Sequence, residues 1–235
     1  MNTALSQGIQ PEHTIKSFVK RSGRLTQSQQ QALDNLSTKY LIDKRLEDGT
    51  FSQFFEEKLQ RHYLEIGFGN GQSLLHMAQS HPFDQFLGIE VHTPGIGQLM
   101  NNLHQQTIDN VKICTKDAAT LLRDDIPNQS LDGILVFFPD PWPKRKHQKR
   151  RLVQQDFIDI ISQKLKTGGM FHMATDWSDY AKDVLKLLKI NPHFKNMAKN
   201  DNFHFRPNYR AHTKFEKRGE KLGHQIFDII FKYLP

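Results

Sequence analysis

Short apolar runs alternate with helix-like segments along most of this 235-residue chain. The runs are Tyr63–Ile66, Gln85–Val91, Val111–Thr115, Gly133–Phe138 and Met170–Thr175. Apolar residues at helical spacing follow each run, in the segments after Gly71, at Thr93–Thr107, Ala118–Leu122, Leu152–Leu165 and Asp179–Leu188. Strands that alternate with helices of about 10–15 residues predict an α/β fold with a doubly wound, mostly parallel sheet. Gly168 and Gly169 are expected to end the fourth of these helices.

The two ends of the chain extend this pattern differently. Residues 1–31 are polar and basic and are predicted to form a flexible N-terminal arm. Residues 32–235 are predicted to form a single domain, because no linker or repeat divides them. Within that domain Phe51, Phe54 and Phe55 have a spacing that suits one buried helix face, and the tail Gln225–Leu234 is strand-like.

The charge of the chain indicates an anionic partner. Its net charge is +7 and its pI is near 9.4, which favours nucleic acid over a membrane surface, since no basic amphipathic helix or apolar anchor is found. A single cysteine excludes an internal disulfide framework. Together with the lack of a signal peptide and of a transmembrane window, this predicts a cytoplasmic protein.

A glycine loop follows the first predicted strand. Gly67, Gly69 and Gly71 allow a ligand to approach the strand-to-helix turn closely. Glu90 follows Gly71 by nineteen residues and ends the second strand, where an acid grips a ribose diol. Nucleotide-binding sheets in general share these features.

Two details favour S-adenosylmethionine over NAD. Gln72 stands where the G-x-G-x-x-G pattern has its third glycine, and Glu65 precedes the first glycine, where its charge would repel a pyrophosphate. S-adenosylmethionine has no phosphate and carries an ammonium and a sulfonium group. Glu65 near the methionine end, Glu90 on the ribose and Asp117 beside the adenine amine form a coherent set of acceptors. Each acid taken alone could equally be a solvated loop carboxylate.

A proline-rich turn with a basic tail follows the fourth strand. It holds one acid, Asp140, and one aromatic residue, Trp142, and six Lys or Arg fall among the eight residues 144–151. Ligands of open α/β sheets bind at the carboxyl ends of strands, so this turn is expected to border the site. The alternative is a rigid turn followed by a solvated basic helix start.

With these residues in view, the chain resembles the bacterial tRNA (guanine-N7-)-methyltransferase family over most of its length. The matching stretches are Val19–Thr26, Leu64–Gly71, Gly88–Glu90, Phe138–Lys144, Thr175–Asp176 and Thr213–Gly219. The glycine loop is common to many methyltransferases, whereas Pro-Asp-Pro-Trp with its basic tail and Thr-Lys-Phe-Glu are far more specific.

The resemblance implies a seven-stranded sheet of the class I S-adenosylmethionine-dependent methyltransferase type. It also implies methylation of N7 of the guanine at position 46, in the tRNA variable loop, with Asp140 as the catalytic residue. The implied cofactor-binding residues are Glu65, Gly67, Glu90, Asp117 and Asp140. The implied substrate-binding residues are Lys144, Asp176, Thr213, Lys214, Phe215 and Glu216. The implied RNA contacts are Lys146, His147, Gln148, Lys149, Arg150 and Arg151.

The chemistry of N7 agrees with these residues. N7 carries a free lone pair, so neither a Cys nucleophile nor a His base is needed, and His172 is expected to be a hydrogen-bonded core residue. No metal is expected, because the Cys and His spacing offers no ligand set. The guanine would be gripped on its opposite edge by Asp176 and Glu216, unless these acids pair with Lys214, Lys217 or Arg218. Trp142 or Tyr209 could stack on the extruded base.

Two rival interpretations remain open at this stage. An exocyclic-amine methyltransferase also uses an acid-proline-aromatic turn, usually with two adjacent prolines after the acid, whereas Asp140 is followed by Pro141 and Trp142. A binding module with an inert methyltransferase sheet is the second rival. The oligomeric state, monomer or homodimer, is not determined by the sequence.

Overall fold

The computed structural model describes residues 23–43, 60–212, 216–217, 221 and 223–234. The first 22 residues of the predicted arm, the Phe51–Phe55 helix face and Thr213 to Phe215 lie outside the described residues.

A seven-stranded sheet forms the centre of the molecule, with strand order β3-β2-β1-β4-β5-β7-β6. Its strands are β1 His62–Ile66, β2 Gln85–Ile89, β3 Val111–Cys114, β4 Leu131–Phe137, β5 Leu165–Thr175, β6 Phe194–Asn196 and β7 Phe227–Tyr233. β1 to β5 pair in parallel, and β7 runs antiparallel to both of its neighbours. The α/β fold and the mostly parallel sheet predicted from the alternating pattern are therefore confirmed.

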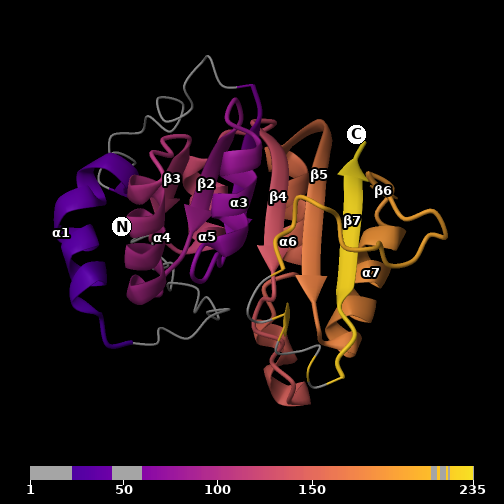
Figure 1. The fold of residues 1–235 in the computed structure, drawn as a ribbon. Helices are drawn as coiled ribbons and strands as arrows, with labels where there is room; N and C mark the ends of the chain where they lie inside the picture. The colour runs from indigo at the N-terminus through magenta and orange to yellow at the C-terminus, as the bar shows by residue number, and fades with distance from the viewer. Residues whose placement is uncertain (1–22, 44–59, 213–215, 218–220, 222, 235) are drawn as a thin grey trace, which may run out of the picture.

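Helices cover the sheet in two groups (Figure 1). They are α1 Gln27–Tyr40, α3 Gln72–Ser80, α4 Thr93–Gln105, α5 Ala118–Thr120 with the π-turn η2 Leu121–Asp125, the 3₁₀ helix η3 Arg145–Arg150, α6 Gln155–Lys164 and α7 Ser178–Ile190. Apolar residues of α1, α3 and α4 form one hydrophobic cluster, and those of α5, η2, α6 and α7 form the other. The clusters lie on opposite faces because successive residues of a strand point to opposite sides. In β4, for example, Leu135 joins the first cluster and Ile134 and Val136 join the second.

Besides shifts of a few residues at element ends, three features of the fold differ from the predicted ones. Helix α1 begins at Gln27, inside the predicted arm, because Thr26 and Gln29 form a capping box. Gly168 and Gly169 do not end α6. Helix α6 ends at Lys164, and both glycines lie within β5, where the register with β4 shifts between Leu131 and Gly133. The short strand β6 was not predicted, since three residues are too few for a periodic signal.

The segment between β6 and β7 takes the place of a helix on part of the sheet. In Figure 1 this segment, drawn in orange to yellow, crosses in front of β4, β5 and β7. Tyr209 in this segment contacts Met170 and His172 of β5, and Arg210 contacts Phe137 of β4 and Asp228 of β7. These polar contacts tie the carboxyl-end half of the sheet to the C-terminal part of the chain.

The strand register aligns the carboxyl ends of the parallel strands at one edge. Ile66 of β1 pairs with Ile89 of β2 and Val136 of β4, and Val136 pairs with Met173 of β5. The residues that follow these strands therefore meet along that edge. Among the described residues, no helix is long and apolar enough to cross a membrane.

Candidate functional site

The glycine loop after β1 has a backbone that other residues would strain. Gly67, Gly69 and Gly71 have φ values of +73°, +60° and +75°. The loop packs against helix α4, because a Cβ added at Gly95 would lie 2.0 Å from the carbonyl oxygen of Gly69. A Cβ added at Gly67 would meet no atom within 4 Å, so the space beside this residue is open to a ligand.

Glu90 connects the glycine loop to the end of β2. Its Oε2 accepts a hydrogen bond from the Gly69 N–H at 2.8 Å. Its Oε1 accepts from the backbone N–H groups of Val91 and His92, at 2.7 and 2.9 Å. Glu90 therefore fixes the loop, and the remaining lone pairs of its carboxylate can accept from a ribose.

Glu65 is a buried acid near the end of β1. Its side chain is only 2% exposed, and Oε2 has no hydrogen-bond partner within the part of the chain that the structure describes. Burial, and secondarily the negative charge of Glu90, raise the pKa of Glu65 to about 8. A cationic donor placed between these two carboxylates would relieve both their repulsion and the missing hydrogen bond.

Asp117 follows β3 and caps helix α5. Its Oδ1 accepts from the backbone N–H groups of Ala119 and Thr120, both at 3.1 Å. The cap fixes the carboxyl group, so that Oδ2 can face a ligand amine at the edge where β3 ends. The sequence pattern identified the acid and its strand end but not its capping role.

The turn after β4 presents Asp140 at the surface. Asp140 is exposed and lies between two non-glycine residues with left-handed backbones, Phe138 with φ of +52° and Trp142 with φ of +44°. The Arg150 guanidinium lies 5.0 Å from the centre of the Trp142 ring, and the His147 ring meets it edge-on. One face of Trp142 is thus already in contact with a cation.

The basic segment, residues 144–151, contains both exposed and buried cations. Lys144, Arg145, Lys146, Lys149 and Arg150 are exposed, and His147 and Gln148 are half-buried. Desolvation and then the neighbouring cations lower the pKa of His147, so this histidine carries less positive charge at neutral pH than an isolated histidine would. Arg151 differs from all of them, because its side chain is 4% exposed and paired with Asp183. The structure therefore does not present Arg151 at the surface expected for an RNA contact.

The implied substrate-binding acids lie in different surroundings. Asp176 follows β5 and is paired with His224, with 3.2 Å between Oδ2 and Nδ1. Glu216 is 2% exposed, and both of its oxygens accept from Arg210, at 2.7 and 2.9 Å. Lys217 is not the partner in either pair, and Lys214 and Arg218 lie outside the described residues. Since the carboxylate of Glu216 is committed to Arg210, it anchors its segment rather than lying open for a guanine edge.

Arg210 is the centre of a buried ion-pair cluster that the sequence analysis missed. Besides Glu216 it pairs with Asp228, which also accepts from His172 Nε2 at 2.8 Å. Burial acts to raise the pKa of Asp228, but His172 and Arg210 outweigh it and the pKa lies below its usual value. Burial lowers the pKa of His172, which is fully buried, so the prediction of a hydrogen-bonded core histidine is confirmed. An acid inside the apolar run of β7 was the signal that could have revealed a buried cationic partner.

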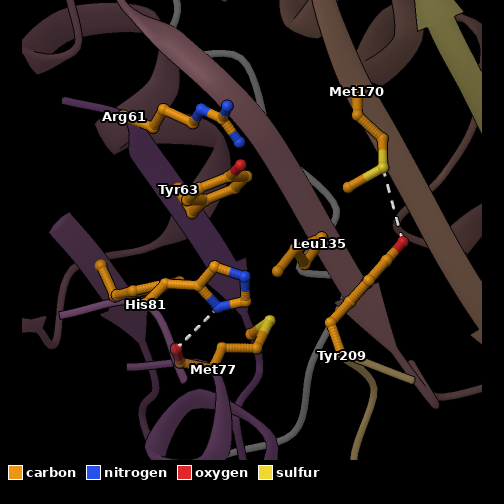
Figure 2. A pocket seen from close by; sticks show the side chains of 8 residues that line it. Arg61, Tyr63, Met77, His81, Leu135, Met170 and Tyr209 are labelled. Carbon is orange, nitrogen blue, oxygen red and sulfur yellow. Dashed lines mark hydrogen bonds between the residues drawn. The ribbon is translucent and has the colours of Figure 1, made fainter. Parts of the chain in front are cut away.

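A cavity of about 270 Å³ lies away from this edge (Figure 2). Its walls include Arg61 and Tyr63 at the amino end of β1, Phe86 near the start of β2, and Tyr209. The Tyr209 hydroxyl contacts Met170 and hydrogen-bonds to Nδ1 of His172. The hydroxyl end of Tyr209 therefore points into the interior cluster. Of the two aromatic residues named for stacking on the base, Trp142 is the one in the Asp140 turn.

The buried Glu65 carboxyl predicts a specific pH dependence of stability. Its pKa is raised in the folded state, so its contribution is fully present below the unfolded pKa of about 4.5 and is lost as pH rises through about 8. Glu65→Gln keeps the shape without the ionisation. Between pH 5 and 8 the variant should gain free energy of unfolding relative to the parent, by at most about 5 kcal/mol, because one pKa unit is worth ~1.4 kcal/mol.

Urea unfolding of both ligand-free proteins at pH 5, 6, 7 and 8 measures this difference. Comparing the two proteins cancels the other titrating groups. Parallel stability curves over this range would contradict a buried, unpaired Glu65.

The chain is similar to known methyltransferases over nearly its whole length. Residues 60–229 match the family model Methyltransf_4, whose description reads "Putative methyltransferase". A tRNA (guanine-N(7)-)-methyltransferase of Stutzerimonas stutzeri (strain A1501) is 45% identical over 231 residues, which cover 97% of this chain and 96% of that protein. One from Francisella tularensis subsp. novicida (strain U112) is 47% identical over 222 residues, 93% of this chain and 94% of that protein.

Solved structures agree in fold. The 16S rRNA methyltransferase KamB matches with a TM-score of 0.59 and 11% identity, over 80% of this chain and 94% of that chain. A geranyl diphosphate C-methyltransferase from Streptomyces coelicolor A3(2), solved with S-adenosyl-L-homocysteine, matches with a TM-score of 0.51 and 11% identity, over 81% of this chain and 76% of that chain. At such low identity these likenesses establish the class I methyltransferase fold alone.

The identity to the curated relatives over most of both chains establishes more than the fold. With the glycine loop, the acids at the strand ends and the Asp140 turn in place, the chain belongs to the tRNA (guanine-N(7)-)-methyltransferase family.

Proposed function

We propose that this protein transfers the methyl group of S-adenosylmethionine to N7 of the guanine at position 46, in the variable loop of tRNA. The observation that carries the choice of methyl donor is the buried Glu65 carboxyl, whose Oε2 has no hydrogen-bond partner in the described part of the chain and which lies beside Glu90 near the open space at Gly67. A cationic nucleoside without phosphates suits this environment, and a pyrophosphate does not. The names of the relatives support tRNA and N7 as the acceptor, and a tRNA-modifying role is consistent with the cytoplasm.

The cofactor pocket is proposed to use acceptors from three strand ends. Glu65 would hold the methionine ammonium, Glu90 the ribose hydroxyls and Asp117 the adenine amine, with Gly67 leaving space for the backbone approach. In the bound state the ammonium held by Glu65 would favour the charged form of this carboxylate. Bound there, S-adenosylmethionine supplies an electrophilic methyl group.

The chain's own contribution to the reaction is placement and electrostatics. N7 of guanine has a free lone pair, so no residue has to remove a proton before the attack. Holding N7 in line with the methyl group is worth up to ~7–11 kcal/mol of the barrier. Asp140 would orient the base and stabilise the positive charge that develops on the purine ring. Lys144, which follows the Asp140 turn, and Asp176, which follows β5, would both hold the substrate. Glu216, through Arg210, would anchor Thr213 to Phe215 for the same purpose.

The basic segment is proposed to hold the tRNA backbone. Lys146, Lys149 and Arg150 would contact phosphates, and His147 and Gln148 would add neutral hydrogen bonds. The direct test of the whole proposal is methyl transfer to unmodified bulk tRNA, followed by nucleoside analysis of the product. The proposal requires N7-methylguanosine as the product, and methylation of an exocyclic amine would contradict it.

Glu90→Ala should weaken binding of S-adenosylmethionine much more than binding of tRNA. The variant loses the ribose acceptor and frees the Gly69 N–H, so a loss of about 10- to 100-fold is expected from the ~1.5–3 kcal/mol of a charged hydrogen bond. Equilibrium binding of radiolabelled S-adenosylmethionine and of tRNA to the same preparation measures both. Equal losses for the two ligands in a folded protein would remove Glu90 from the cofactor site.

Asp140→Ala should lower the rate of methyl transfer more than it weakens tRNA binding. The exposed carboxylate contributes orientation and charge at the reacting centre, which matters more in the transition state than in the bound state. Single-turnover rates and tRNA affinities of Asp140→Ala and Asp140→Asn provide the comparison. A rate within a few-fold of the parent in both variants would rule out the catalytic role.

Neutralising Lys149 and Arg150 together should flatten the salt dependence of tRNA binding. Each lost phosphate contact removes about 0.7–0.9 units of the log-log slope. Lys182→Ala, an exposed lysine on α7, is the control for a change in net charge alone. A slope that falls no further in the double variant than in this control would reduce the basic segment to a solvated surface.

A further inference from the structure

The turn that carries Asp140 has too few backbone hydrogen bonds of its own to fix its conformation. Pro139, Pro141 and Pro143 have no N–H to donate, so the usual turn hydrogen bonds are lost at alternate positions. Phe138 and Trp142 adopt left-handed backbones, which non-glycine residues keep only where the surroundings impose them. At the start of the turn, the Phe138 N–H donates to the Ala174 carbonyl of β5 at 2.8 Å. The conformation beyond Asp140 needs a second anchor.

Arg151 supplies that anchor from the end of the basic segment. Its Nε donates to the carbonyl oxygen of Pro141, the residue after Asp140, at 3.0 Å. Its Nη1 donates to Oδ2 of Asp183 on helix α7 at 2.6 Å. The guanidinium also lies 4.7 Å from the centre of the Tyr180 ring, on the same helix. One side chain therefore connects the turn to a helix packed on the core.

Burial separates Arg151 from its neighbours in the sequence. The side chain of Arg151 is 4% exposed, whereas Lys149 and Arg150 are exposed. A buried guanidinium already paired with a carboxylate would have to leave both partners to reach a phosphate, and the loss of those contacts opposes this. The arrangement also suits arginine better than lysine, because the two contacts come from separate nitrogens, Nε and Nη1, of one rigid planar group, whereas lysine has a single nitrogen to reach both acceptors.

We propose that Arg151 is a positioning residue that holds the Phe138–Pro143 turn, and with it Asp140, against helix α7, and that it does not contact RNA. We refer to Arg151 and Asp183 together as the clamp, because Asp183 accepts the hydrogen bond that connects Arg151 to α7. The proposal rests on the proposed role of Asp140 and assigns two residues that act on the reaction without touching the substrate.

Two substitutions separate positioning from RNA contact. Arg151→Lys keeps the charge but replaces the rigid guanidinium, with its separate Nε and Nη1 donors, by a single nitrogen, so kcat should fall at least about tenfold while KM for tRNA and the salt slope of tRNA binding stay within about twofold of the parent. Asp183→Asn removes the acceptor from α7, where its side chain is 62% exposed, and should lower kcat several-fold. Loss of a negative charge cannot weaken phosphate binding, so tRNA affinity should be unchanged or higher in Asp183→Asn.

Matched variants define the controls. Asp179→Asn removes an exposed acid one turn earlier on α7 and should leave kcat unchanged. Arg150→Ala should reduce the salt slope, as an exposed cation does. Thermal unfolding of each protein checks the fold, and if Arg151→Lys fails to fold, Asp183→Asn against Asp179→Asn decides alone.

The clamp is overturned if Asp183→Asn keeps the parental kcat, or if Arg151→Lys keeps kcat while Arg151→Ala flattens the salt slope as much as Arg150→Ala. Asp140→Ala distinguishes this failure from that of the proposed function. An inactive Asp140→Ala beside fully active Arg151→Lys and Asp183→Asn refutes the clamp alone. An active Asp140→Ala refutes the role of Asp140 itself, and the clamp as proposed with it.

Discussion

The carboxyl group of Glu65 is buried near the end of β1, its Oε2 has no hydrogen-bond partner among the described residues, and the rest of the site is arranged around it. The strand register brings Glu65 close to the glycine loop and to Glu90, whose charge raises the pKa of Glu65 further. Glu90 in turn accepts one hydrogen bond from the Gly69 N–H of the loop and two from the backbone N–H groups of Val91 and His92. A site of this kind repels phosphates and favours a cation, so the same glycine-loop architecture that binds dinucleotides elsewhere is here suited to a sulfonium nucleoside.

Two buried arginines hold the two segments that are proposed to bind the methyl-accepting guanine. Arg151 connects the Asp140 turn to α7, and Arg210 connects the Glu216 segment to Asp228 of β7. The Asp140 turn lies outside regular strands and helices, so it lacks ladder hydrogen bonds of its own, whereas Glu216 has a helical backbone. A buried guanidinium with several fixed donors is an effective anchor for such segments, because leaving any partner unpaired in the interior is costly. The exposed cations of the basic segment remain available for the tRNA backbone.

The sequence predicted the sheet and the acids at its edge, but not how the segments that carry chemistry are held. Periodicity identified β1 to β5 because buried parallel strands read as continuous apolar runs. It assigned Gly168 and Gly169 to a helix end, since a bulged strand has no distinct local signal. Arg151 looked like its neighbours, because proximity in a charge run does not reveal which side chain turns inward. Arg210 and Asp228 lie 18 positions apart, and only the fold brings their charges together.

The proposal that N7 itself accepts the methyl group can be tested with one substituted tRNA. A tRNA with 7-deazaguanine at position 46 keeps the Watson–Crick edge and the shape of the base but replaces the nucleophilic nitrogen with a carbon. If N7 is the nucleophile, this tRNA should bind with nearly the affinity of the unmodified tRNA, compete with it, and receive no methyl group at that position. Transfer of a labelled methyl group to the deaza base would contradict the assignment of N7.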